Sequence, residues 1–382
     1  MRHSVPRKSG SRGLSRPVTT GTIYLSILSE YVMTIPKTMK AAILVEQRKP
    51  LVIDEVELPD SLDVGQVLVK IHYSGICGSQ LGEIDGVKGE DRFLPHLLGH
   101  EASATVMEVG LGVRTVRSGD AVVLHWRKGQ GIESAPPKYR WRGKTVNAGW
   151  LTTFNEYAIV SEDRMTPIPD DTDLDVAALF GCAVTTGFGV IENNAQVRIG
   201  ESVVVYGAGG IGLNIVQAAS LVSAYPIVAI DRYDNKLELA SKMGATHTIN
   251  SSNVNSKEEI MGVVGEYGVD CFIDNTGNID VIEMGYDIVN VKHGRVTLVG
   301  VPKRGEKISI NTLPLHFGKN ISGSYGGNGD PATDILRYHN LYRKGKISLG
   351  DVITNTYGIN LINDAISGMR NGEISGRCVV KM

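Results

Sequence analysis

The sequence has little cysteine, few aromatic residues and almost no net charge. Its 382 residues include only 4 cysteines, which are too few for a disulfide framework in a chain of this length. The net charge is -2 at pH 7, so no excess of one sign favours nucleic acid or an anionic membrane surface. No run of about 18 apolar residues predicts a membrane-spanning helix. We therefore expect a cytoplasmic protein that binds neither nucleic acid nor membranes.

Glycine and hydrophobic residues, in contrast, are plentiful. The chain contains 45 glycines, and 42% of its residues are hydrophobic. This length and composition are typical of two or three globular domains, each with its own core. The many glycines indicate tight turns and close backbone contacts, which suit an α/β protein.

The residues before Met39 differ from the rest of the chain. Basic residues occur there among serines and threonines, and the first acidic residue is Glu30. We expect residues 1–38 to form a disordered N-terminal extension. It is similar to a targeting segment, and the alternative is an extension from an upstream start codon, with the working protein beginning at Met33 or Met39.

Hydrophobic residues alternate with polar ones over much of 39–169. Val67, Val69 and Ile71, for example, share one face of a run. The clearest such runs are 66–73, 102–109 and 121–126. A period of two that is interrupted by glycine predicts short half-buried strands. We expect a compact antiparallel barrel or sandwich in this part.

Strands and helices alternate from about residue 177 onwards. The expected strands are 203–205, 227–230, 271–274 and 296–299, and the expected helices are 211–220 and 235–243. This alternation predicts a parallel sheet that is covered by helices on both faces. After residue 325, a helix at 334–344 and short strands follow, which we expect to return to the first domain.

A glycine-rich turn follows the first strand of the expected parallel sheet. Gly207, Gly209, Gly210 and Gly212 fit the G-x-G-x-x-G pattern, and the turn opens a helix. Gly207 permits a tight turn, Gly209 lets the backbone approach a pyrophosphate, and Gly212 lets helix and strand pack closely. The N-H groups at the start of the helix then face the anion. The alternative is a glycine turn that binds no ligand.

An acidic residue ends the next strand, as dinucleotide binding requires. Asp231 lies 19 residues beyond Gly212. Its carboxylate accepts hydrogen bonds from ribose hydroxyls and repels a 2′-phosphate, so it favours NAD over NADP. The neighbouring Arg232 is expected to stack on adenine or, alternatively, to soften this preference.

Cys77, His100 and Cys182 are candidate metal ligands. Two thiolates and an imidazole suit Zn²⁺, and three protein ligands leave the fourth position free for water or substrate, as in a catalytic site. Spacing alone does not decide this, because an isolated cysteine or histidine is also an ordinary buried residue. We assign that ordinary role to Cys271 and Cys378.

The order of these motifs resembles the zinc-dependent medium-chain alcohol dehydrogenases. The matching segments are 75–79 (GICGS), 99–101 (GHE), 119–122 (GDAV), 181–187 (GCAVTTG) and 207–212 (GAGGIG). The resemblance covers Met39 to Met382. It implies a mainly β, chaperonin-10-like catalytic domain at 39–186, a doubly wound Rossmann domain for NAD at 187–325, and a return to the catalytic domain at 326–382.

The resemblance also implies a function and roles for particular residues. The family transfers a hydride between an alcohol and NAD through a zinc-bound alkoxide. Cys77, His100 and Cys182 are then the zinc ligands, and Arg377 contacts the pyrophosphate. Ser79 lies next to the reacting oxygen and Thr186 next to the nicotinamide. Glu101 either approaches the metal or is an acid that contacts a metal ligand or a basic side chain.

Two other functions remain as alternatives. One is a zinc-free reductase on the same scaffold, and the other is a non-catalytic dinucleotide-binding protein. We expect a small alcohol or carbonyl substrate, and the family implies a homodimer or homotetramer. Residues 123–150 lack the four cysteines that hold a second, structural zinc in many members, so we expect one zinc ion per chain.

Residues near the expected site depart from the family pattern. Gln80 stands where the family usually has an aspartate that orients the ligand histidine, and Gly82 stands where some members have a proton-relay histidine. The loop at 126–144 is rich in basic residues, so it either contacts an anionic substrate or is a solvated or subunit-contacting loop. We expect a pocket that includes Ser79, His96, Trp126, Tyr139 and Phe154, and polar loops that favour a polyol or a sugar derivative.

Overall fold

The structure is a computed structural model that describes residues 35–382. The expected extension at 1–38 therefore lies almost wholly outside the described residues. In the described part, no helix is both long enough and apolar enough to cross a membrane.

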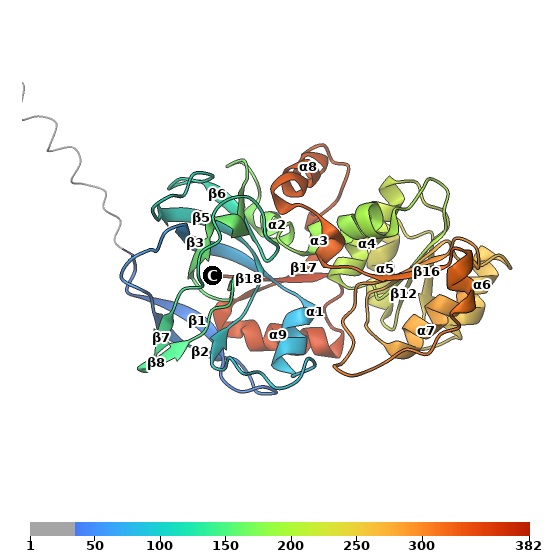
Figure 1. Cartoon of the computed structure of the whole chain (residues 1–382), viewed down its shortest axis with the longest axis horizontal. Helices are drawn as coiled ribbons and strands as arrows, with labels where there is room; N and C mark the ends of the chain where they lie inside the picture. The colour runs from blue at the N-terminus through green and yellow to red at the C-terminus, as the bar shows by residue number, and fades with distance from the viewer. Residues whose placement is uncertain (1–34) are drawn as a thin grey trace, which may run out of the picture. The chain divides into compact units, whose positions relative to one another are not determined.

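Two mainly antiparallel sheets form the N-terminal part (Figure 1). One sheet has the order β4-β1-β2-β7-β8. The other has the order β10-β6-β5-β3-β18-β17, in which β17 (Ile353–Gly358) and β18 (Arg377–Lys381) come from the end of the chain, and β9 also pairs with β3. The bounds are β1 Thr38–Leu44, β2 Val52–Glu57, β3 Gln66–Ile76, β4 His96–Leu97, β5 Glu101–Val109, β6 Ala121–His125, β7 Tyr139–Trp141, β8 Lys144–Val146, β9 Tyr157–Ser161 and β10 Met165–Pro167. The helices of this part are α1 Gly78–Ile84, α2 Leu174–Leu179 and α3 Ala183–Gly189.

The first half of strand β3 is buried on both faces, although its sequence predicted a half-buried strand. Val67, Val69 and Ile71 lie in one hydrophobic cluster, as the alternation predicted. Leu68, on the opposite face, lies in a second cluster together with Met39. The difference arises because β3 is an inner strand with hydrophobic residues packed against both of its sides.

A six-stranded parallel sheet forms the second part, with the strand order β13-β12-β11-β14-β15-β16. Its strands are β11 Val203–Tyr206, β12 Ile227–Asp231, β13 His247–Asn250, β14 Cys271–Asp274, β15 Arg295–Leu298 and β16 Asn320–Gly323. The connecting helices are α4 Gly210–Leu221, α5 Asp234–Lys242, α6 Ser256–Val264 and α7 Ile279–Ile288.

Both faces of this parallel sheet are buried. Val203 and Val205 lie in one hydrophobic cluster, and Val204 lies in another on the opposite face. The strand order is that of a doubly wound dinucleotide-binding fold. The predicted fold class, a Rossmann sheet with a mainly β chaperonin-10-like domain, is confirmed.

The last described segment returns to the first part of the fold. It contains α8 Pro331–Arg343, β17 Ile353–Gly358, α9 Ile362–Asn371 and β18 Arg377–Lys381. Strand β18 pairs antiparallel with β3, so that Cys378 lies opposite Ile76. The end of the chain therefore lies beside the residue that precedes Cys77.

His125, at the end of β6, is a buried histidine with a fixed set of partners. It is 1% exposed, its Nδ1 lies 2.7 Å from the carbonyl oxygen of Arg127, and its Nε2 lies 3.0 Å from Oγ1 of Thr166. Burial lowers the pKa of His125 to about 4. The folded protein therefore holds this ring in its neutral form at neutral pH.

Because His125 resists protonation in the folded state, the protein should lose stability as the pH falls below 6.5 towards 4, where only the unfolded chain binds the proton. We expect His125 to account for a loss of about 2 kcal/mol between pH 7 and pH 5. Urea unfolding at both pH values tests this. The loss should shrink by that amount in His125→Gln and persist in the exposed control His247→Gln; equal losses in all three proteins would contradict it.

Candidate functional site

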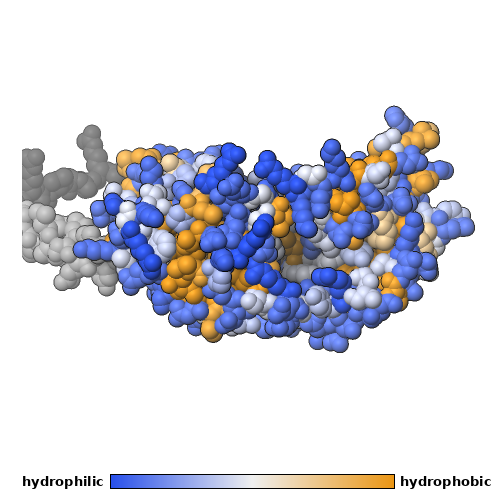
Figure 2. All heavy atoms as spheres, turned by 90° about the horizontal axis from the view of Figure 1, so that it is seen from below, coloured by the Kyte–Doolittle hydropathy of each residue, from blue (hydrophilic) through white to orange (hydrophobic). Residues whose placement is uncertain are grey.

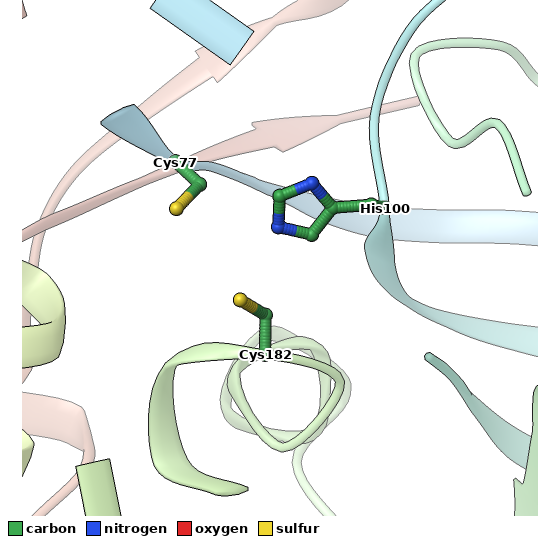
Figure 3. Close-up of side chains that lie close together, drawn as sticks. All are labelled: Cys77, His100 and Cys182. Atoms are coloured by element: carbon green, nitrogen blue, oxygen red, sulfur yellow. The ribbon is translucent and has the colours of Figure 1, made fainter. Parts of the chain in front are cut away.

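Cys77, His100 and Cys182 come together from three separate segments. Cys77 follows β3 and caps α1, His100 immediately precedes β5, and Cys182 caps α3. One ligand atom from each residue lies within 4.8 Å of the other two. Figure 3 shows both sulfur atoms and Nε2 of the imidazole pointing towards one common point.

The chemistry of this cluster fits a zinc ion. Within residues 35–382, Nε2 of His100 is buried and has no hydrogen-bond partner. Cys77 and Cys182 are 5% and 4% exposed, so both thiols are also withdrawn from water. Two sulfurs and one imidazole nitrogen form a donor set that Zn²⁺ prefers, and three ligands leave one tetrahedral position open.

The two cysteines differ in acidity because they contact each other. The hydrogen bond from Cys182 lowers the pKa of Cys77 well below its ordinary value, against the effect of burial and with help from Arg377 and His100. The same contact, together with burial, raises the pKa of Cys182. A bound cation would remove this difference, because a metal favours the thiolate form of both residues.

Glu101 and Arg377 form a buried ion pair beside the cluster. Glu101 is 0% exposed and Arg377 is 3% exposed, and Nε of Arg377 donates to Oε1 of Glu101 at 2.8 Å. The other carboxylate oxygen accepts from the backbone N-H of Ala183 at 3.1 Å. Burial raises the pKa of Glu101, and the charge of Arg377 opposes that effect. Glu101 is thus a salt-bridged acid in this structure.

Arg377 also lies close to the glycine turn. A Cβ atom on Gly210 would come within 2.8 Å of Cδ of Arg377. The side chain therefore runs between Glu101 and the start of α4, where the sequence predicts a pyrophosphate. Its guanidinium is paired with Glu101, and the pyrophosphate contact stays a prediction.

Ser79 and Thr186 carry hydroxyl groups on the helices that begin after Cys77 and Cys182. Oγ of Ser79 is buried and lacks a hydrogen-bond partner among the residues that the structure describes. Oγ1 of Thr186 lies 3.9 Å from Sγ of Cys182. The structure therefore places Thr186 next to Cys182. Ser79 lies two residues beyond Cys77, and its hydroxyl is unpaired among the described residues.

The glycine turn has the geometry that its sequence predicted. Gly207 has a φ of +100°, which is the left-handed region that favours glycine. A side chain on Gly212 would overlap the carbonyl oxygen of Gly207, so only glycine permits this close packing. At Gly209 a Cβ would meet no described atom within 4 Å, so that backbone faces open space.

Asp231 ends β12 and supports the glycine turn. Its Oδ2 accepts from the backbone N-H of Ala208 at 2.9 Å, and Oδ1 accepts from the N-H of Arg232 at 2.8 Å. The guanidinium carbon of Arg232 lies 5.6 Å from the ring of Tyr233. The carboxylate is thus fixed at the end of β12, beside the turn.

Trp126 and Tyr325 form an aromatic wall next to His100. The Trp126 and Tyr325 rings are 4.9 Å apart at 89°, and the Trp126 and His100 rings are 6.5 Å apart. Arg127 donates to the carbonyl oxygens of Tyr325 and Gly329, and its guanidinium lies 4.7 Å from the Tyr325 ring. Tyr325 was not predicted as a site residue, and its only signal in the sequence was the glycine pair that follows it.

Two residues that we expected in the pocket lie in the core instead. Tyr139 and Phe154 are both 0% exposed and belong to hydrophobic clusters. The hydroxyl of Tyr139 accepts from the backbone N-H of Ile159 at 2.8 Å, so its polar atom is used within the core. His96, a third residue that we expected in the pocket, has its Nε2 2.6 Å from Oδ2 of Asp91, so its ring has a partner within the protein.

Several basic residues of the 126–144 loop are already paired. Lys128 contacts Glu133 at 2.6 Å, and Arg142 contacts Asp54 at 2.7 Å. Arg127 is bonded to backbone carbonyl groups, as described above. These contacts reduce the charge that an anionic substrate would meet.

Comparisons with known proteins agree with this geometry. Residues 63–170 match the family model of the alcohol dehydrogenase GroES-like domain, and residues 210–339 match that of the zinc-binding dehydrogenases. The S-(hydroxymethyl)glutathione dehydrogenase of Paracoccus denitrificans is 31% identical, over 87% of this chain and 97% of its own. The class-3 alcohol dehydrogenase of Cereibacter sphaeroides is 30% identical with the same coverage.

Solved structures show the same architecture. The benzyl alcohol dehydrogenase of Acinetobacter calcoaceticus has a TM-score of 0.81 and 27% identity, and the match covers 91% of this chain and 100% of that one. An alcohol dehydrogenase zinc-binding domain protein from Burkholderia ambifaria has a TM-score of 0.82 and 27% identity, covering 90% and 99%. This chain therefore belongs to the zinc-dependent medium-chain alcohol dehydrogenases, and it is an NAD-dependent zinc enzyme that transfers a hydride between an alcohol and NAD.

Proposed function

We propose that Cys77, His100 and Cys182 hold one catalytic zinc ion, at which this chain oxidises alcohols that carry a hydrophobic, preferably aromatic, substituent. The observation that carries the metal assignment is the convergence of the three donor atoms within 4.8 Å. When bound, zinc polarises the substrate oxygen and NAD accepts the hydride.

The residues around the cluster have separate tasks in this reaction. The unpaired hydroxyl of Ser79 would accept the proton of the substrate alcohol while it gives its own proton to solvent water. Thr186, next to Cys182, would lie beside the nicotinamide of bound NAD. The carboxylate of Asp231 would bind the ribose hydroxyls of NAD, and the backbone of Gly207 to Gly212 would hold its pyrophosphate. Arg377 neutralises Glu101 and lowers the pKa of the Cys77 thiol.

The contacts of Trp126 support a hydrophobic substrate. Its ring lies 6.5 Å from the His100 ring and 4.9 Å from the Tyr325 ring, so aromatic surface lies close to one of the three candidate ligands. Polyols, which the sequence favoured, gain little from such a wall because they expose hydroxyl groups to it. The pairing of Lys128 and Arg142 gives no support to an anionic substrate.

The ligand assignment is tested with a pair of buried cysteines. Cys182→Ala should lose its zinc and at least about 100-fold in kcat/KM, because two remaining ligands hold zinc poorly. The control Cys271→Ala removes an equally buried thiol from β14 and should keep one zinc per chain. Elemental analysis and NADH formation measure both. Full zinc occupancy in Cys182→Ala would contradict the assignment.

The substrate class is tested with a panel of alcohols and one variant. Benzyl alcohol should have a kcat/KM at least about tenfold above those of sorbitol and S-(hydroxymethyl)glutathione, because an aromatic ring packs against Trp126. Trp126→Ala should raise KM for benzyl alcohol more than it lowers kcat. A preference for S-(hydroxymethyl)glutathione, the substrate named for the Paracoccus relative, would overturn this part of the proposal.

We further place the enzyme in the cytoplasm as a homo-oligomer that assembles through the edge of its parallel sheet. The four cysteines are free and buried, which suits a reducing compartment. Strand β16 pairs with β15 alone among the described strands, so its other edge is open. Leu313 and Phe317, just before it, are 62% and 67% exposed. Figure 2 shows hydrophobic side chains at the end of the molecule that carries β16.

Assembly is tested by charging this surface. Leu313→Asp combined with Phe317→Asp should convert the oligomer into monomers, because buried carboxylates oppose the interface. Leu111→Asp, at a residue that is 79% exposed on the β part, is the control and should leave the mass unchanged. Light scattering after gel filtration measures the mass. A double variant that keeps the wild-type mass would exclude this interface.

A further inference from the structure

The side chain of Gln80 connects two of the three proposed metal ligands. Gln80 lies in the first turn of α1 and is 1% exposed. Its Oε1 accepts a hydrogen bond from the backbone N-H of Cys77 at 2.9 Å. Its Nε2 contacts Nδ1 of His100. One buried amide therefore meets both residues at once.

The partners of this amide determine which way it faces. A backbone N-H only donates, so the oxygen of Gln80 must face Cys77. The amide NH2 group then faces Nδ1 of His100, which must accept. A neutral imidazole that accepts at Nδ1 carries its proton on Nε2. Nε2 is the atom that points towards the two sulfurs (Figure 3).

A metal ion requires the opposite arrangement of the imidazole. Zinc binds the lone pair of Nε2, so the proton of the neutral ring moves to Nδ1. Metal-binding histidines normally donate that N-H to a carboxylate, a carbonyl group or water. The NH2 group of Gln80 cannot accept it. Rotating the amide by half a turn would place its oxygen next to Nδ1-H of His100. The same rotation would turn the NH2 group towards the N-H of Cys77.

From this mismatch, and resting on the proposed zinc site, we propose that Gln80 is a positioning residue that favours the metal-free form of His100 and so speeds metal release. In either orientation of the amide, one donor faces another donor when zinc is bound. Partners of metal ligands typically change affinity by about 10 to 100-fold. The site should therefore exchange its zinc faster than the same site with an acceptor at position 80.

Gln80→Glu supplies that acceptor without changing the length of the side chain. Its two carboxylate oxygens accept from the N-H of Cys77 and from Nδ1-H of His100 at the same time. We expect zinc release to slow by about 10 to 100-fold. Gln80→Met, which has a similar length and no donor, should release zinc no faster than the wild type.

The test uses the full chain loaded with zinc and mixed with an excess of a colour-forming chelator, so that release is followed without turnover. Cobalt-loaded samples report the ligand set through their thiolate-to-cobalt absorption. Gln217→Glu is the matched control, because Gln217 is 6% exposed and its amide also meets two groups, donating to the carbonyl oxygen of Ser348 at 3.3 Å and accepting from the N-H of Ser348 at 2.5 Å. It should release zinc at the wild-type rate.

The possible results separate this inference from the proposed function. Slower release from Gln80→Glu alone, with an unchanged cobalt spectrum, supports the inference. Equal or faster release from Gln80→Glu, or faster release from Gln80→Met, overturns it while the zinc site stands. If Gln80→Glu does not fold, the rate of zinc release from Gln80→Met decides alone. A wild-type chain that binds neither zinc nor cobalt would remove both the inference and the proposed metal site.

Discussion

The buried ion pair between Glu101 and Arg377 is the contact around which the active site is arranged. A side chain on Gly75 would overlap the Glu101 carboxylate, and the N-H of Ala183 donates to that carboxylate. Arg377, in turn, fills the space beside Gly210 at the start of α4. Strands β3, β5 and β18 and helices α3 and α4 thus meet at one pair of charges. Since removal of one partner from a buried pair typically costs about 3 to 5 kcal/mol, these elements depend on one another.

Contacts between the β part and the parallel-sheet part of the fold also shape the space near His100. Trp126 belongs to the segment that follows β6, whereas Tyr325 follows the last strand of the parallel sheet. Arg127 joins these segments through two carbonyl oxygens, and a side chain on Gly326 would come within 2.5 Å of the Trp126 ring. The aromatic wall therefore exists only while both parts of the fold are in contact. The space beside Trp126 consequently depends on how the two parts are arranged.

Local patterns in the sequence predicted most of the architecture, but they did not predict which distant charges pair. The alternation in β3 and the glycine turn at Gly207 depend on neighbouring residues, so the sequence reveals them directly. The partner of Arg377 is Glu101, 276 residues away, and no periodicity links the two. The core position of Tyr139 was also hidden, because its hydroxyl finds a backbone partner that only the folded sheet supplies. At Gln80 the sequence showed the departure from the family, whereas its consequence required the positions of Cys77 and His100.

The C-terminal segment pairs with the first part of the fold, and this pairing affects how the enzyme is made in a cell. Strand β18, which pairs with β3 and carries Arg377, is the last described strand to leave the ribosome. Until then Glu101 lacks its counter-charge, and the segment around Cys77 lacks a neighbouring strand. The thiols of Cys77 and Cys182 thus remain in an unfinished environment during translation. A nascent chain that stalls before residue 377 already contains Cys77, His100 and Cys182 but lacks the strand that completes their surroundings, and incompletely folded chains of this kind expose surface that the native fold covers.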